Sequence, residues 1–367
     1  MIIGVMLISE QKKYRQQLDC TPRIDTNRFL ESIEAFPAQA RQAWSEARHV
    51  HIPSNYRTVK TILALGMGGS GWPARIIRTL FANDLKIPMT VLGDYRLPGW
   101  VDRNTLVIVS SYSGTTEEPL TAAKSARTRG SKMMAITLGG SLVALVKKWR
   151  IPAYVFTETY NPSRQPRMGA GYMIFGTAGL LAAAGQLRLT DRQIISALSR
   201  TIQKTRTWRS ASPLSKNLSK QWAVQMKGRI PIIMASEHLE ATAEAFRNRI
   251  NENAKQFSAY YPIPDLNHHL LEGLANPTAA RRLLGVFLTS DLYDRRNQKR
   301  HEITRKVFEH NHVPTVMFRA GGNDRVEDAL NSLAFSGYAT YWLSILNQVD
   351  ASVIPWVDYF KDRLARR

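Results

Sequence analysis

A carboxylate and an imidazole in the second half of the chain could act together to move protons. Glu252 lies near the end of an expected helix, and His268 follows it by 268 − 252 = 16 residues, across a loop that contains proline. If the fold brings both side chains into one cleft, they can move a proton between adjacent carbon atoms and open a sugar ring. The structural alternative is that Glu252 faces solvent and that His268 and His269 cap a helix. The two histidines also lack the partner spacing of a metal site.

Two turns rich in glycine and hydroxyl groups, in the first half of the chain, could hold a phosphate group. Residues 66–71 include four glycines, and residues 111–116 include two serines and two threonines. Each turn stands between a short apolar run and a helical stretch, so backbone N–H groups and hydroxyls can point outward together and bind an anion. Either turn alone could be an ordinary helix cap. The first turn matches neither the dinucleotide-binding glycine pattern nor the P-loop, so nucleotide binding is not favoured.

These residues lie in a chain in which short apolar strands alternate with helices, which predicts a doubly wound α/β fold with parallel sheets. Such sheets bind ligands at the carboxyl ends of their strands, where both turns are expected. We expect strands at residues 61–65, 89–92, 105–110, 132–137, 153–156, 229–234, 283–288 and 314–318. We expect helices at residues 25–48, interrupted at Pro37, and at 74–81, 117–129, 169–186, 240–255, 294–309 and 326–349.

The alternation divides the chain into two domains with a basic segment between them. We expect an N-terminal domain at residues 1–190, a connecting segment at 191–227 and a C-terminal domain at 228–367. Residues 235–238 of the second domain stand where the first domain has its glycine turn. We therefore expect the second domain to supply catalytic side chains more than phosphate contacts.

Length and composition fit a globular protein of two domains. The chain has 367 residues, of which 44% are hydrophobic, and this is enough for two full cores. Its single cysteine, Cys20, excludes an internal disulfide and a cysteine-based metal site, and it favours the reducing cytoplasm. The apolar start at residues 1–8 is too short for a signal peptide or a membrane span, so we expect no association with a membrane.

A formal net charge of +21 raises the question of nucleic-acid binding. The basic residues are concentrated at 188–229 and 295–306, but no zinc-finger spacing, RNA-recognition motif or basic zipper organises them. We favour a solvated basic surface that attracts an anionic substrate over a dedicated nucleic-acid face. At most, we expect weak and salt-sensitive binding to nucleic acid.

From residue 25 to residue 361, the sequence resembles the bifunctional phosphoglucose/phosphomannose isomerase family of the sugar isomerase (SIS) domain superfamily. The resemblance rests on the order and spacing of segments 66–71, 111–116, 166–167, 251–255, 266–268, 344–350 and 358–361. It implies two SIS domains, each a parallel five-stranded sheet flanked by helices in a three-layer, flavodoxin-like sandwich. It also implies a homodimer with shared active sites. The implied reaction interconverts glucose 6-phosphate or mannose 6-phosphate with fructose 6-phosphate, and it needs no metal or redox cofactor.

The same resemblance implies a role for particular residues in each domain. The sugar phosphate would be held by hydroxyls and backbone of the two turns, at Gly69, Ser70, Ser111, Ser113 and Thr116. Glu252 would carry a proton between C1 and C2 through a cis-enediolate, and Arg167 would stabilise the negative charge of that intermediate. His268, from the neighbouring subunit, and Lys361 would serve ring opening.

Several segments depart from the family pattern. The departures are Trp72 and Pro73 after the first turn, Thr115 in the second, residues 269–271 after His268, and residues 351–353 in the tail. They affect substrate choice and rate, while the expected catalytic and phosphate-binding residues are retained. Two alternatives stay open: a sugar-phosphate sensor without catalysis, and an isomerase of another phosphosugar, such as a pentose or amino sugar phosphate.

Overall fold

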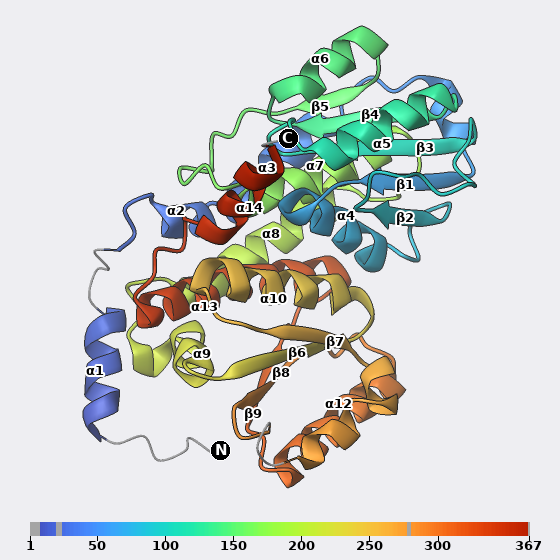
Figure 1. Cartoon of the computed structure of the whole chain (residues 1–367). Coiled ribbons are helices and arrows are strands. Elements are labelled where there is room, and N and C mark those ends of the chain that lie inside the picture. The colour runs from blue at the N-terminus through green and yellow to red at the C-terminus, as the bar shows by residue number, and fades with distance from the viewer. Residues whose placement is uncertain (1–7, 20–23, 277–279, 366–367) are drawn as a thin grey trace.

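The computed structural model of the chain describes residues 8–19, 24–276 and 280–365 (Figure 1). Cys20 and residues 1–7 of the apolar start lie outside these ranges, so the expectations for them concern residues that are not described. Within the described ranges, no helix is long and apolar enough to cross a membrane. Two parallel sheets, blue to green for the first and yellow to orange for the second in Figure 1, form the cores of two α/β domains.

The N-terminal sheet has the five parallel strands that the sequence predicts, in the order β2-β1-β3-β4-β5. Successive side chains of a strand point to opposite faces, so Ile62 and Ala64 join one apolar cluster while Leu63 and Leu65 join another. This explains why the central strands are apolar throughout. The strands are β1 (Thr61–Leu65), β2 (Met89–Leu92), β3 (Thr105–Ser110), β4 (Lys132–Thr137) and β5 (Ala153–Val155).

Helices cover both faces of this sheet. α5 and α6 pack on one face through Ala122, Ala126 and Leu142, and α3, α4 and α7 cover the other. α7 is buried along almost its whole length and packs against α3, because small residues let the two helices approach closely. The helices of this part are α1 (Ile8–Asp19), α2 (Phe29–Glu34), α3 (Phe36–Ala47), η1 (Ser54–Thr58), α4 (Gly68–Leu80), α5 (Glu117–Thr128), α6 (Gly140–Trp149), η2 (Pro166–Met168) and α7 (Ala170–Ala183).

The C-terminal sheet is also parallel, with the order β7-β6-β8-β9. The fold class is thus confirmed, but among the described residues this sheet has four strands and not the expected five. The reason is that the chain after β9 continues into two helices, α13 (Arg325–Asn347) and α14 (Pro355–Ala365), and not into a further strand. The strands are β6 (Ile230–Ala235), β7 (Ala259–Pro262), β8 (Leu283–Thr289) and β9 (Thr315–Arg319).

The central helix of this half is α13, which is buried from Val326 to Leu346 and packs against α8, α9 and α10. α12 covers the opposite face of the sheet through Phe308, which packs with Phe287. The other helices are α8 (Asp191–Thr205), η3 (Arg206–Trp208), η4 (Leu214–Lys216), α9 (Leu218–Met226), η5 (Glu237–Leu239), α10 (Glu240–Ala254), η6 (Asp265–His268), η7 (Leu271–Ala275) and α12 (Arg295–His310).

The basic segment 191–227 runs from the start of α8 to just beyond α9. Part of its charge is structural, in contrast to the expected solvated surface. Lys220 is fully buried, where its Nζ donates to Asp19 Oδ1 at 2.9 Å and lies 4.7 Å from the centre of the Trp342 ring. Lys227 Nζ donates to the Leu346 carbonyl at 2.8 Å, at the end of α13. A cation at this position is favourable because the last carbonyls of a helix carry partial negative charge.

Two helix boundaries differ from the sequence prediction in ways that bear on the site. The expected helix at 25–48 divides into α2 and α3 at Ala35, because Pro37 fits the first turn of a new helix. α4 begins at Gly68 and not at Ala74, so the glycine turn is itself the first turn of the helix. The N–H groups of Ser70 and Gly71 donate to the Met67 carbonyl, so the expected backbone contact of Ser70 to phosphate is already used. The N–H groups of Gly68 and Gly69 stand at the carboxyl end of β1.

Candidate active site

The two turns of the N-terminal domain lie side by side and are joined through Ser70. The Ser70 hydroxyl accepts a hydrogen bond from the backbone N–H of Tyr112 at 2.8 Å, and Ser110 Oγ donates to the Ser70 carbonyl at 2.8 Å. β1 and β3 are neighbours in the sheet, which places the two turns at one edge. The structure thus brings the two predicted phosphate-binding turns together, with the Ser70 side chain used to hold them.

The hydroxyls of the second turn have different surroundings. Ser111 is fully buried and braces the turn, since its Oγ donates to Thr116 Oγ1 at 3.0 Å and accepts the N–H of Gly114 at 3.1 Å. Ser113 is exposed, and its Oγ lies 3.0 Å from Thr115 Oγ1. Thr116 precedes α5 and uses its oxygen as an acceptor from Ser111, so its own hydrogen is available to a ligand. Ser113 and Thr116 are therefore better placed than Ser111 to meet an anion.

Tyr112 connects this turn to the segment that leads to Arg167. Its hydroxyl donates to Glu158 Oε2 at 2.6 Å and accepts from Asn161 Nδ2 at 2.9 Å. The ring lies against Gly169, where any Cβ would come within 2.2 Å of a ring carbon. Burial, and then the hydrogen bond to Glu158, raise the pKa of Tyr112, so the phenol stays neutral. The sequence motif includes Tyr112 but gives no indication of this structural role.

Arg167 is the best-connected side chain of the site. It is only 4% exposed, and its backbone lies beside Gly69 of the first turn. Nε donates to Asn253 Oδ1 at 2.9 Å and Nη1 to Gln165 Oε1 at 3.0 Å. Nη2 donates to the carbonyl oxygens of residues 351 and 352. A guanidinium has five N–H groups, so these four bonds leave one for a substrate, together with the positive charge.

Glu252 meets Arg167 across the boundary between the domains. It lies in the last turn of α10, one third exposed, with Oε2 at 3.9 Å from Arg167 Nε. Burial raises the pKa of Glu252, while the charges of Arg167, Lys361, Arg249 and Lys255 oppose that rise. A raised pKa makes a carboxylate a stronger proton acceptor, which suits a general base.

Lys361 and Lys255 approach the same carboxylate from different segments. Lys361 belongs to the exposed helix α14. Its charge opposes the rise in the pKa of Glu252, and only the charge of Arg167 opposes it more strongly. Lys255 follows α10, and its Nζ donates to the Asp350 carbonyl. Burial, and then the charge of Arg167, lower the pKa of Lys255 to about 8. Sequence reasoning named Lys361 and missed Lys255, although Lys255 ends the segment 251–255 that carried the resemblance.

His268 does not join Glu252 within one chain. It is exposed at the end of η6, where the neighbouring Asn267 Nδ2 donates to Thr304 Oγ1 of α12 at 2.7 Å. α12 lies at the lower right of Figure 1, below the second sheet, whereas α14 lies near the centre, above that sheet. Glu252 lies in the last turn of α10, the helix that returns from β6 to the amino end of the parallel strand β7, whereas His268 follows the carboxyl end of β7. A separation of 16 residues therefore does not make the two side chains neighbours.

The structure gives physical roles to three of the family departures. Trp72, where the family commonly has a small residue, is buried, and the Arg249 guanidinium lies 5.6 Å from the centre of its ring. The tryptophan ring therefore packs against a buried cation. The altered tail still binds Arg167, because it does so through backbone carbonyls that do not depend on side-chain identity. Leu270 and Leu271 pack against the apolar cluster under η6.

Comparison with known proteins gives relatives along most of the chain. Residues 215–364 match the family of the bacterial phospho-glucose isomerase C-terminal SIS domain. A bifunctional phosphoglucose/phosphomannose isomerase of Caldicellulosiruptor bescii is 29% identical over 92% of this chain and 99% of its own length. A D-glucosamine-6-phosphate 4-epimerase of Sulfolobus acidocaldarius is 29% identical over 65% of this chain and 71% of its own.

A hypothetical protein from Thermus thermophilus has the same fold over the whole chain. Its crystal structure superposes with a TM-score of 0.71 and covers 98% of this chain and 94% of its own, at 15% sequence identity. At that identity the likeness concerns the fold alone. It agrees with the two-domain arrangement described above.

Proposed function

We propose, from the match of residues 215–364 to the family of the bacterial phospho-glucose isomerase C-terminal SIS domain, that the protein is an aldose-ketose isomerase. Its substrates are glucose 6-phosphate and mannose 6-phosphate, which it interconverts with fructose 6-phosphate. The similarity to bifunctional phosphoglucose/phosphomannose isomerases over 92% of the chain supports this choice. The observation that carries it is the meeting of Glu252 with Arg167, 3.9 Å apart, beside the glycine turn of the other domain.

The N-terminal domain binds the phosphate group of the substrate. Ser113, Thr116 and the backbone N–H groups at the start of α4 are the donors, and Ser70 and Ser111 keep the two turns in position. This division follows from burial, since Ser113 is exposed while Ser111 is fully buried. Several N–H and O–H donors aimed at one anion account for recognition of the phosphate.

Glu252 carries the proton in the chemical step. It takes the proton from C2 of the open-chain aldose, which leaves a cis-enediolate with its negative charge on the C1 oxygen. The proton returns to C1 while the hydrogen of the C2 hydroxyl moves to the C1 oxygen, so C2 becomes the ketone carbon. Arg167 stabilises the enediolate through its buried charge and its remaining N–H group.

Ring opening precedes this step and involves Lys361 and His268. Lys361 belongs to the same chain as Glu252, whereas His268 comes from a second copy, because it is remote from Glu252 within one chain. The active form is therefore a homodimer with shared sites. Glucose and mannose 6-phosphates differ only at C2, and both give the same enediolate, so one site can accept either.

One observation favours a second candidate, an enzyme acting on another phosphosugar. The relative from Sulfolobus acidocaldarius is named a D-glucosamine-6-phosphate 4-epimerase, and it is as similar in identity as the isomerase relative, over a smaller part of the chain. An amino sugar phosphate would use the same phosphate-binding turns. A sensor without catalysis has less support, because it has no need for a base beside a buried arginine.

The direct test is incubation of purified, metal-free protein with fructose 6-phosphate, with the products resolved by NMR. We expect both glucose 6-phosphate and mannose 6-phosphate to form, and neither to form with Glu252→Gln. A single product would restrict the proposal to one epimer. Binding without turnover, followed by conversion of glucosamine 6-phosphate, would favour the second candidate.

A further inference from the structure

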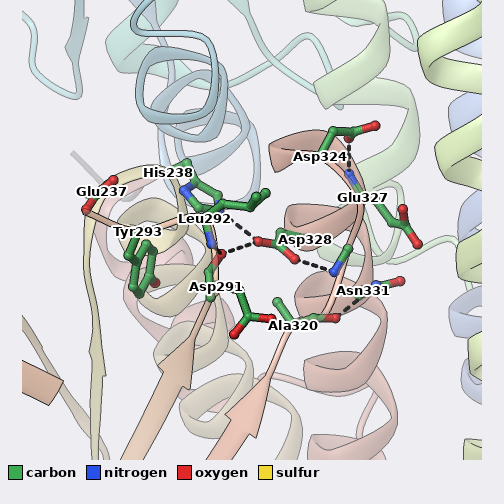
Figure 2. A network of polar contacts seen from close by, with 12 residues as sticks. Glu237, His238, Asp291, Leu292, Tyr293, Ala320, Asp324, Glu327, Asp328 and Asn331 are labelled. Carbon is green, nitrogen blue, oxygen red and sulfur yellow. Dashed lines mark hydrogen bonds and ion pairs between the residues drawn. The ribbon is translucent and has the colours of Figure 1, made fainter. Parts of the chain in front are cut away.

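Three loops of the C-terminal domain converge on one buried carboxylate. Asp328, in the first turn of α13, is only 1% exposed and lies at the carboxyl ends of β6, β8 and β9. Figure 2 shows the imidazole of His238 and the carboxylate of Asp328 pointing towards each other, with Leu292 beside them. This is the edge at which a parallel α/β sheet normally binds a ligand.

Each loop gives Asp328 one donor. His238, after β6, lies with Nε2 at 3.1 Å from Asp328 Oδ2. Ser290, after β8, donates its hydroxyl to the same oxygen. The N–H of Gly322, after β9, donates to Oδ1 at 2.6 Å. A carboxylate can only accept, so all three groups act as donors towards it.

The arrangement repeats that of the N-terminal domain. The order β7-β6-β8-β9 corresponds strand by strand to β2-β1-β3-β4. Ser290 thus follows β8 as Ser111 follows β3. A Cβ on Gly322 would come within 2.9 Å of Asp328 Oδ1, so only glycine permits this approach. Phosphate-binding turns use glycine for the same reason, because a residue without a Cβ atom lets the backbone come close to the anion.

Nearby cations suit an anion at this position. Lys204 Nζ donates to the Ala320 carbonyl, which begins the loop after β9, and the charge of Asp328 opposes the lowering of its pKa by burial. Arg200 is paired with Glu327 and Asp324 at the edge of the same loop. Removal of the Asp328 carboxylate alone would leave two buried donors, on His238 and Ser290, the half-buried N–H of Gly322 and a nearby ammonium without their anion.

We propose that the carboxyl edge of the C-terminal sheet is a small-anion site that the chain fills with its own Asp328 carboxylate. A carboxylate or oxyanion of formate size takes this site when the side chain is removed. In the intact protein the site is closed to ligands, and the residues that the domain contributes to the proposed reaction, Glu252, His268 and Lys361, lie outside it. The inference stands on the contacts of Asp328 and does not depend on the proposed reaction.

The test is the thermal unfolding of Asp328→Ala in sodium formate and in sodium chloride at the same ionic strength. We expect the variant to unfold at a lower temperature than the wild type, and formate to restore several degrees that chloride does not. Wild-type protein should respond equally to both salts. If formate restores no more than chloride, the inference is wrong.

Two control variants separate a vacated anion site from a general salt effect. Glu327→Ala removes the adjacent buried carboxylate, whose main partner Arg200 is about one third exposed and open to water, so formate should give no specific recovery. Asp328→Asn keeps the space filled, so it should also show none. Recovery in either control equal to that of Asp328→Ala would overturn the inference.

A folding failure of Asp328→Ala in chloride would still decide the question. In that case the variant is refolded from urea with each salt, and the yield of folded protein is measured by circular dichroism. Formate-dependent recovery supports a vacated anion site. Equal failure in both salts contradicts it.

Discussion

The two sheets share strand order but differ in what their carboxyl edges leave free. At the N-terminal edge, Ser113 is exposed and the Thr116 hydroxyl keeps a hydrogen to donate. At the C-terminal edge, donors from three loops all point to Asp328. The shared topology provides the place for a ligand, whereas a few side chains at the edge, such as Asp328 in the first turn of α13, decide whether a ligand can enter.

The difference also separates binding from chemistry. If the N-terminal domain holds the phosphate while α10 of the C-terminal domain brings the base, then variants of the two domains should fail in different ways.

The largest effect is expected from Glu252→Gln, which removes the base and keeps its shape. We expect kcat to fall by ~10²–10⁴-fold, the usual contribution of general base catalysis, while the Kd for fructose 6-phosphate changes little. Single-turnover kinetics and calorimetry give the two quantities. The matched control is Glu244→Gln, on the same helix, which pairs with Arg75 away from the site. A parallel loss of affinity would show that Glu252 also binds the substrate.

Ser113→Ala should give the opposite result. We expect binding of the phosphosugar to weaken by about 1.5–3 kcal/mol, the range for a hydrogen bond to a charged group, with a smaller change in kcat. Ser54→Ala, at another exposed serine, should leave affinity unchanged. Unchanged affinity of Ser113→Ala would remove this hydroxyl from the phosphate site.

Tyr112→Phe tests the link between the two parts of the site. Loss of the hydroxyl removes its hydrogen bonds to Glu158 and Asn161, yet these two residues can still pair, at 3.2 Å. We expect a loss of ~1 kcal/mol in stability, the typical net value of one hydrogen bond, and a modest rise in KM. Denaturant unfolding and steady-state kinetics measure the two. An unchanged KM would show that the link does not position the phosphate turn.

The smallest effect concerns pH. Burial lowers the pKa of Lys255 to about 8 from a usual value near 10.5. Because the unfolded chain binds this proton more tightly, the contribution of Lys255 to stability is unfavourable below pH 8 and improves as pH rises from about 8 towards 10.5. Lys255→Met should therefore lose that part of the increase in unfolding free energy with pH. Denaturant unfolding at a series of pH values measures this, and the same dependence of unfolding free energy on pH in wild type and Lys255→Met would contradict the prediction.

Much of the fold follows from sequence because the central strands are apolar on both faces and separated by regular helices. β7 was missed, since Ala259–Pro262 is short, half-buried and ends in proline. The start of α4 was placed too late because glycines do not predict helix, although here they form its first turn. Both errors arise where tertiary contacts override local preference.

The site was less predictable than the fold. Arg167 and Asn253 are 86 residues apart and meet only because the two domains dock. Glu252 and His268 are near in sequence, yet they lie at opposite edges of the second sheet. No sequence pattern indicates that Asp328 accepts hydrogen bonds from three loops, since an aspartate in the first turn of a helix is an ordinary feature. Sequence motifs identified the residue types, and the docking of domains decided which of them meet.

The hydrogen bonds of Arg167 have a consequence for the order of events during folding. Three of the four join residues that are 86 to 185 positions apart in the chain, from η2 to Asn253 and to the carbonyls of Ala351 and Ser352. Contacts over such long separations form late, because the intervening chain must first give up its freedom. Either sheet can acquire its secondary structure before this arginine finds its partners. During refolding, catalytic activity would thus return later than the circular dichroism signal. The rate at which activity returns would report the rate at which the two domains dock.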